Sequence, residues 1–175
     1  MSDNLHLVFS KPPASISDEA YNQWYDFHLG EILVVPGFVS ARRYRLATIK
    51  GAWTPSGHRY LSAYELEGEP KEVMAELDKE VASGRMKLPE WFPQVPGFLA
   101  NWRFRLEPEV IDASSPTAAT HLALYEVDRD LATLRANLDA ARVNNEAGWP
   151  SWFDPTPWTS LDANAIGQRV PAPAR

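Results

Sequence analysis

The chain has no cysteine among its 175 residues. It can therefore form no disulfide, offers no thiol nucleophile and binds no metal through thiolate. It also has no apolar run as long as the roughly 18 residues that a membrane span requires. Basic residues are not in excess, since the net charge is -6. Nucleic-acid binding needs a basic surface, so we expect neither a nucleic-acid nor a membrane partner. The N-terminus, MSDNLHLVF, does not resemble a signal peptide, which predicts a cytoplasmic protein.

Aromatic residues, by contrast, are abundant: they make up 11% of the chain and include seven tryptophans. Several lie in segments with the composition of loops or strand edges, among them Trp53, Trp91 and Trp152. Large rings in such places either seal a small core or line a pocket for a flat, apolar ligand. Both interpretations stay open at this stage.

Hydrophobic periodicity predicts six elements in the order β-α-β-β-α-β. The expected strands cover residues 5–10, 38–47, 59–66 and 99–106, and the expected helices cover 18–35 and 70–83. Ser17 is a suitable N-cap for the first helix, and Pro36-Gly37 ends it. This order predicts an α+β, ferredoxin-like fold with two helices on one face of a four-stranded antiparallel sheet. The other face is left apolar, so we expect a partner chain or an appended segment to cover it.

An internal repeat extends the pattern. Sliding the chain by 61 positions aligns residues 60–92 with residues 121–153 without a gap. The recurring pairs include Tyr64-Glu65 as Tyr125-Glu126, Leu77-Asp78 as Leu138-Asp139, and Trp91-Phe92 as Trp152-Phe153. We therefore predict a ferredoxin-like domain over 1–107, a linker over 108–119, and a repeated β-α half unit with a loose tail over 120–175. The recurrence of the tyrosine indicates a packing role common to both copies.

The first predicted helix carries a polar stripe. Tyr21, Trp24, His28 and Glu31 follow one another at steps of three, four and three, which places them on one helix face. An imidazole titrates near neutrality and can give or take a proton at physiological pH. His28 is therefore either a general acid or base in a cleft, or a structural histidine hydrogen-bonded to the Glu31 carboxylate or to a nearby carbonyl.

These residues resemble the dimeric α+β barrel superfamily, particularly its EthD-like and related groups. The resemblance rests on Trp24-x-x-x-His28, Glu31-Ile32-Leu33, Pro36-Gly37-Phe38, and the segments SARRYRL and AYELEG. It implies a homodimer built on the ferredoxin-like fold. Members of the superfamily include polyketide cyclases, muconolactone-type isomerases and quinol- or haem-directed monooxygenases, so the fold does not select one reaction. His28 resembles the helix histidine of EthD-like proteins, and His6 resembles the strand-one histidine of cofactor-free cyclases.

The candidate site combines these observations. The predicted catalytic residues are His28 as acid or base, Glu31 to orient it, and Tyr64 or His6 to stabilise an oxyanion. The predicted substrate-binding residues are Trp24, Tyr25, Arg43, Trp91, Phe92 and Trp102. For Arg43 the alternative is a solvated strand face. We expect His58 to be exposed, and His121 begins the repeated strand.

We expect no cofactor and no metal. His28 and Glu31 have the spacing of two metal ligands on a helix. A complete site would need further ligands from His6, His58 or Glu65, and no spacing in the sequence indicates that these residues join the pair. Phosphate-binding loops, nucleophile elbows and dinucleotide fingerprints have no counterpart in the sequence. The leading prediction is a cofactor-independent lyase, isomerase or cyclase that moves protons on a hydrophobic or aromatic small molecule. The alternative is a non-catalytic protein that binds a small ligand or assists an oxygenase pathway.

Overall fold

The computed structural model describes residues 4–51, 58–92, 99–105, 110–113, 125, 127, 130–144 and 159–174. Its strands are β1 (Asn4–Ser10), β2 (Phe38–Gly51), β3 (Tyr60–Leu66), β4 (Leu99–Arg105), β5 (Val110–Ala113) and β6 (Thr159–Pro171). Its helices are α1 (Asp18–Leu33), α2 (Pro70–Ala82) and α3 (Leu131–Val143). Among the described residues, no helix is long and apolar enough to cross a membrane.

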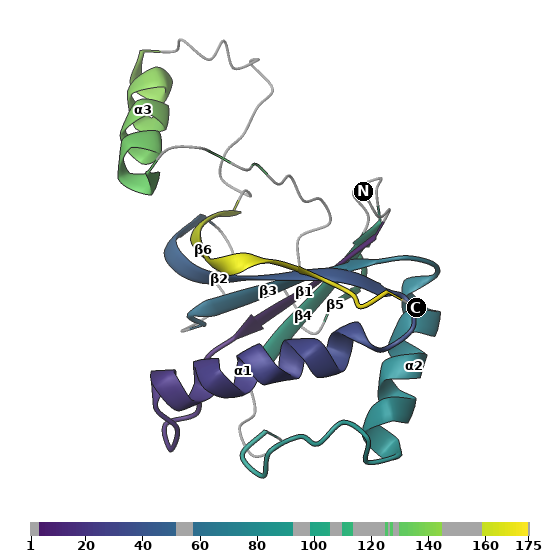
Figure 1. Ribbon diagram of the computed structural model, residues 1–175. Helices are drawn as coiled ribbons and strands as arrows, with labels where there is room; N and C mark the ends of the chain where they lie inside the picture. Colours follow the sequence, from purple (N-terminus) through teal and green to yellow (C-terminus); the bar gives the residue numbers. More distant parts are fainter. Residues whose placement is uncertain are drawn as a thin grey trace.

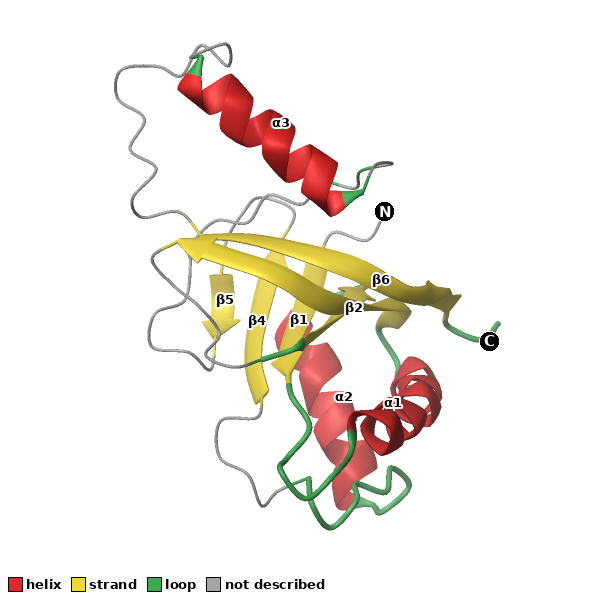
Figure 2. Ribbon diagram, turned by 90° about the vertical axis from the view of Figure 1, so that its left-hand side faces the viewer, coloured by secondary structure: helices red, strands yellow, loops and turns green. Residues whose placement is uncertain are grey.

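The described strands form one antiparallel sheet in the order β5-β4-β1-β3-β2-β6. Its central part, β4-β1-β3-β2, has the strand order of a split β-α-β motif. Helices α1 and α2 lie together on one side of this sheet, whereas α3 lies on the other side (Figures 1 and 2). The α+β class and the six predicted elements of the first 107 residues are therefore confirmed, with an architecture consistent with a ferredoxin-like fold.

Local sequence sets the position of α1. Ser17 is its N-cap, and the Ser17 hydroxyl accepts a hydrogen bond of 3.1 Å from the backbone N–H of Ala20. The helix ends at Leu33, shortly before Gly37, which adopts a positive φ of 93°. A Cβ at Gly37 would lie 2.4 Å from a methyl carbon of Val73 on α2. Glycine is therefore required where the chain turns from α1 into β2.

The main core lies between α1, α2 and the sheet. It contains Tyr21, Tyr25, Leu29, Ile32 and Leu33 of α1, with Val8, Phe38, Tyr60, Tyr64, Leu66, Val73 and Met86 from the sheet, α2 and the following loop. The Tyr21 hydroxyl donates a 2.6 Å hydrogen bond to Ser10 of β1, which ties one end of α1 to the sheet. The opposite end of α1 packs over the centre of the sheet, where the candidate site lies.

The sheet face that points away from α1 is covered at its centre within the single chain. Leu7 and Phe9 of β1 alternate with His6 and Val8 and therefore belong to this face. Leu7, Phe9 and their neighbour Leu61 on β3 are all buried. At these positions the burial within one chain agrees with the expected alternative of cover by an appended segment and does not require a partner chain.

The C-terminal segment is part of the sheet. We expected a loose tail, but β6 pairs with β2 from Ser40 to Gly51, and the backbone N–H of Ala172 donates to the Val39 carbonyl at 2.8 Å. The reason is that β2 is long and would otherwise present an unpaired edge. Likewise, β5 lies within the range predicted as a linker and pairs with β4.

The region of the predicted repeat is described only in part. Helix α3 begins and ends 61 positions after α2, which is the offset of the sequence repeat. The strand predicted from His121 lies largely outside the described residues, so the repeat as a structural unit stays a prediction. Tyr125 is 86% exposed whereas Tyr64 is 1% exposed. The expected packing role common to both tyrosines is therefore wrong.

Candidate functional site

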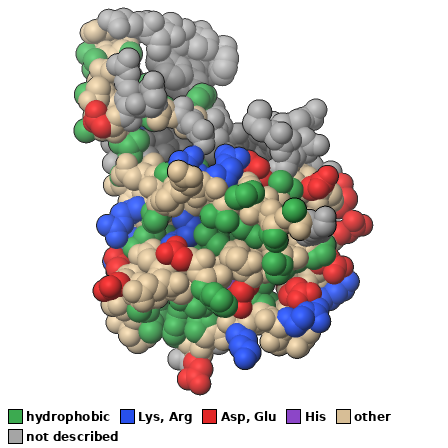
Figure 3. Space-filling view, viewed as in Figure 1, with side chains coloured by type: hydrophobic (Ala, Val, Ile, Leu, Met, Phe, Trp, Pro, Cys, Tyr) green, Lys and Arg blue, Asp and Glu red, His purple; other side chains and the backbone are tan. Residues whose placement is uncertain are grey.

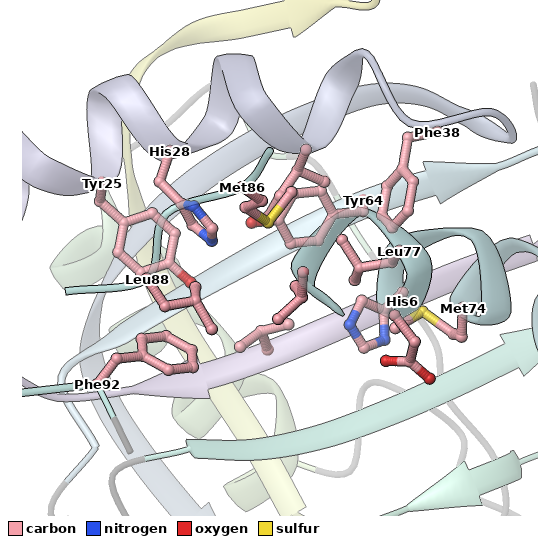
Figure 4. A pocket seen from close by; sticks show the side chains of 14 residues that line it. His6, Tyr25, His28, Phe38, Tyr64, Met74, Leu77, Met86, Leu88 and Phe92 are labelled. Carbon is pink, nitrogen blue, oxygen red and sulfur yellow. The ribbon is translucent and has the colours of Figure 1, made fainter. Parts of the chain in front are cut away.

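A cavity of about 320 Å³ lies between α1, α2 and the sheet. Its described lining consists of His6, Val8, Tyr25, His28, Ile32, Phe38, Tyr64, Met74, Leu77, Asp78, Val81, Met86, Leu88 and Phe92. Figure 4 shows that His28, from α1, and His6, from β1, enter the cavity from different sides. Most of the lining is apolar, and a few polar groups converge in it, which is the usual character of a small-molecule site.

His28 is held on two sides. Its Nδ1 lies 3.1 Å from Oε2 of Glu31, and its ring stacks on Trp24 with centroids 4.4 Å apart. Because a carboxylate only accepts hydrogen bonds, Nδ1 carries the proton and Nε2 keeps its lone pair. Burial lowers the pKa of His28 below its ordinary value of 6.5, while Glu31 acts in the opposite direction. His28 is thus an oriented imidazole that is neutral at pH 7.

Two rings of the loop after α2 support this arrangement. Trp91 meets Trp24 edge-on with centroids 4.9 Å apart, and Phe92 lies 5.8 Å from Trp24 and 6.4 Å from His28. Phe92 lines the cavity, whereas Trp24 and Trp91 lie behind its lining. Trp24, Trp91 and Phe92, which were predicted as substrate-binding residues, therefore cluster next to His28. The two tryptophans support the histidine and do not line the cavity.

His6 and Tyr64 form the floor of the cavity. They are direct partners in the register of β1 and β3, and their rings stack with centroids 5.8 Å apart. Both residues are buried. Burial raises the pKa of Tyr64 well above its ordinary value, and nearby Tyr25 adds to this effect. Tyr64 is therefore a neutral hydroxyl that can donate a hydrogen bond.

Arg43 is buried, so the alternative of a solvated strand face is wrong. Its guanidinium lies 4.3 Å from the centre of the Tyr25 ring and donates a 2.8 Å hydrogen bond to Asn22. A longer contact of 3.5 Å reaches the exposed carboxylate of Asp26. Arg43 does not line the cavity but lies behind Tyr25, which does.

Trp102 lies on β4, where its backbone pairs with Leu7 of β1. The role of its side chain as a pocket wall stays a prediction.

Several cavity residues were not found from the sequence. Helix α2 contributes four residues at helical spacing, which are Met74, Leu77, Asp78 and Val81. Their periodicity predicts a buried helix face, and such a face can border a ligand cavity as well as pack in a core. Met86 and Leu88 come from an irregular loop, where no periodic signal exists. Asp78 is the only acidic residue in the described lining.

The described residues contain no group of three or more histidine, aspartate or glutamate side chains that could hold a metal ion. Glu65, one of the further ligands considered above, instead accepts a hydrogen bond from Ser40 and pairs with Arg169. His58 is half-buried rather than exposed, and His121 lies outside the described residues. His28 and Glu31 therefore form a pair without the additional ligands of a metal site in the part of the chain that the structure describes.

Comparison with known proteins gives no relative for this chain. No family model, no curated protein and no solved structure matches it. The resemblance to the dimeric α+β barrel superfamily therefore stays a prediction, and any function has to be argued from the site.

Proposed function

We propose that this protein is a cofactor-independent enzyme that moves a proton on a hydrophobic or aromatic small molecule, in a reaction of the lyase, isomerase or cyclase type. The observation that carries the proposal is the state of His28. It is buried, its Nδ1 is bonded to Glu31, and the ring borders an apolar cavity. A neutral imidazole with a free Nε2 is a suitable general base at pH 7.

The roles of the neighbours follow from their contacts. Glu31 fixes the tautomer of His28 and stabilises the imidazolium that forms when the ring takes a proton. Tyr64, as a neutral donor on the cavity floor, would stabilise an oxygen atom that gains negative charge. His6 lies beside it and is a second candidate for this role.

The size of the cavity limits the ligand. A volume of 320 Å³ equals that of about ten liquid water molecules, which suits a ligand of roughly ten to fifteen non-hydrogen atoms. The aliphatic and aromatic lining favours a largely apolar compound of one or two rings. A homodimer in the cytoplasm is part of the proposal, on the grounds of the resemblance and of the sequence features described above.

Deuterium exchange on a model ketone tests the proposal. 1-Tetralone fits the size limit and exchanges the protons next to its carbonyl slowly by itself. We expect the protein to accelerate deuterium uptake in D₂O, and His28→Phe to lower this acceleration by about 100-fold or more. Mass spectrometry measures the uptake, and Tyr44→Phe, a tyrosine of the opposite sheet face, is the control. Equal rates for the wild type and His28→Phe would end the assignment of His28 as the base.

The second candidate is a non-catalytic protein that binds a small ligand or assists an oxygenase pathway. The apolar character of most lining residues favours it, because such a lining gives affinity without requiring chemistry. In that case 1-tetralone would bind with no acceleration of exchange, and His28→Phe would leave its affinity unchanged.

A further inference from the structure

A second, smaller cavity lies next to the one that His28 borders. It has a volume of about 160 Å³, and its described lining consists of Glu31, Val34, Glu80, Arg85 and Met86. We call it the outer cavity, and we call the larger one beside His28 the inner cavity. Carbon atoms of these side chains make up most of the surface of the outer cavity. What separates the two cavities therefore decides how long an apolar ligand can be.

Two features form the wall between the cavities. The first is a hydrogen-bonded pair, in which His28 lines the inner cavity, Glu31 lines the outer one, and Nδ1 and Oε2 are 3.1 Å apart. The second is Met86, the one described residue that lines both cavities. Figure 4 shows its side chain among the groups that line the inner cavity.

The backbone at Met86 is tied to α2. Its N–H donates to the Glu80 carbonyl at 3.3 Å, and the preceding residue, Arg85, donates two hydrogen bonds of 2.6 Å to the Glu80 carboxylate. The Met86 side chain is 5% exposed and packs in the main core. The separation of the cavities therefore depends on the volume of this side chain.

Met86 is the part of the wall that can change without loss of the His28 base. It contributes only carbon and sulfur atoms from its side chain, so its truncation leaves the hydrogen bond between His28 and Glu31 in place. Truncation to alanine would join the two spaces. The outer volume of 160 Å³ would then admit roughly five further non-hydrogen atoms of a ligand.

We propose that Met86 is a specificity-determining residue, which closes the inner cavity and limits the ligand to a compact ring compound without a long chain. This inference rests on the proposed function in one respect, the binding of the ligand beside His28. A longer ligand would have to displace a buried methionine, which loses its packing contacts, or leave its chain in solvent, where a methylene gains nothing.

A series of 4-alkylphenols, from ethyl to dodecyl, tests this proposal by titration calorimetry. Each methylene that is buried in the inner cavity should lower the dissociation constant by about fourfold. In the wild type this gain should end once the inner cavity is full, so that longer chains bind no more tightly. In Met86→Ala the end point should move by about four methylenes or more, because the chain continues into the outer cavity.

Two variants serve as controls. Met86→Leu keeps a similar volume and should keep the end point of the wild type. Leu77→Ala removes a similar volume from a wall that borders only the inner cavity, so it should move the end point by about two methylenes at most. Thermal melting shows whether each variant folds. If Met86→Ala does not fold, Met86→Val takes its place and should move the end point further than Met86→Leu does.

The outcomes separate this inference from the proposed function. An equal end point in the wild type and Met86→Ala, or an equal shift in Met86→Ala and Leu77→Ala, would overturn the role of Met86. So would a gain that continues to dodecyl in the wild type. His28 can still act as a base in these cases, since the exchange experiment with 1-tetralone does not involve the outer cavity. If no alkylphenol binds, the inner cavity is not a site for hydrophobic ligands, and both proposals fail.

Discussion

At the scale of single residues, His28 is subject to three separate effects, two of them from single neighbours. Trp24 stacks on the ring and fixes its plane, Glu31 accepts from Nδ1 and fixes the tautomer, and burial disfavours the charged form. The first two effects orient the ring, and the third keeps Nε2 unprotonated at neutral pH. A buried histidine that borders a cavity and has a shifted pKa is a candidate functional residue.

The titration of His28 gives the first residue-scale prediction. Because burial lowers the pKa of His28 below 6.5 and Glu31 raises it, Glu31→Gln should lower this pKa further while its amide oxygen still accepts from Nδ1. NMR titration of the histidine ring nitrogens measures both the pKa and the tautomer. Glu67→Gln, an exposed carboxylate elsewhere, is the control. A pKa of 6.5 or higher for His28 in the wild type would contradict the burial argument.

The same shift has a consequence for stability. Between the lowered pKa of the folded state and 6.5, the unfolded chain binds more protons at His28 than the folded chain does. This contribution to stability is therefore complete above pH 6.5 and is lost as the pH falls through the folded-state pKa. Urea unfolding of the wild type should show this slope, and His28→Phe, which cannot titrate, should lack it.

At the scale of elements, the turn between α1 and β2 positions the site. Gly37 combines a positive φ with close contact to Val73 of α2, so this turn also fixes the distance between the two helices that enclose the cavity. Val73 is buried and its β-branched side chain has few alternative rotamers. The contact therefore cannot relax easily.

Substitution of this glycine gives the element-scale prediction. Gly37→Ala should lower the free energy of unfolding by at least about 3 kcal/mol, since it adds a clash to the cost of a left-handed alanine. Gly84→Ala is the matched control, because Gly84 also has a positive φ but has no atom near its added Cβ. It should cost about 1 kcal/mol. Urea unfolding measures both, and equal losses would show that the contact with Val73 is unimportant.

At the scale of the whole molecule, the C-terminal segment completes the sheet. β6 covers the edge of β2, and Arg169 of β6 pairs with Glu65 of β3. The region 1–107 therefore does not hold all the strands of its own sheet. Hydrophobic side chains on the face that carries α1 are interspersed with charged ones (Figure 3), and such a mixed surface gives no ground of its own for a partner.

Removal of this segment gives the whole-molecule prediction. A chain that ends at residue 158 should lose more than about 3 kcal/mol of stability, because it loses the β2-β6 hydrogen bonds, and the exposed edge of β2 should promote aggregation. A chain lacking only 173–175 is the control, since it keeps Ala172 and its bond to Val39. Urea unfolding and light scattering measure the two effects. Equal stability of both chains would show that β6 is dispensable.

Part of the site was predictable from the sequence because it depends on local geometry. Trp24, His28 and Glu31 are neighbours on one helix, so their spacing alone placed them on one face, and the contacts agree. The position of His6 beside Tyr64 was not accessible in this way. It depends on the register between β1 and β3, which are separated by α1 and β2 in the chain.

The sequence by itself determined the order and the approximate ends of the first six elements, because caps, glycine turns and periodicity act over a few residues. Only the tertiary structure decided that Arg43 is buried, that His6 lies beside Tyr64 and that β6 joins β2. The physical reason is that strand register and edge pairing are set by contacts between distant segments. One step in register moves a side chain to the other face, and a local pattern does not contain that information.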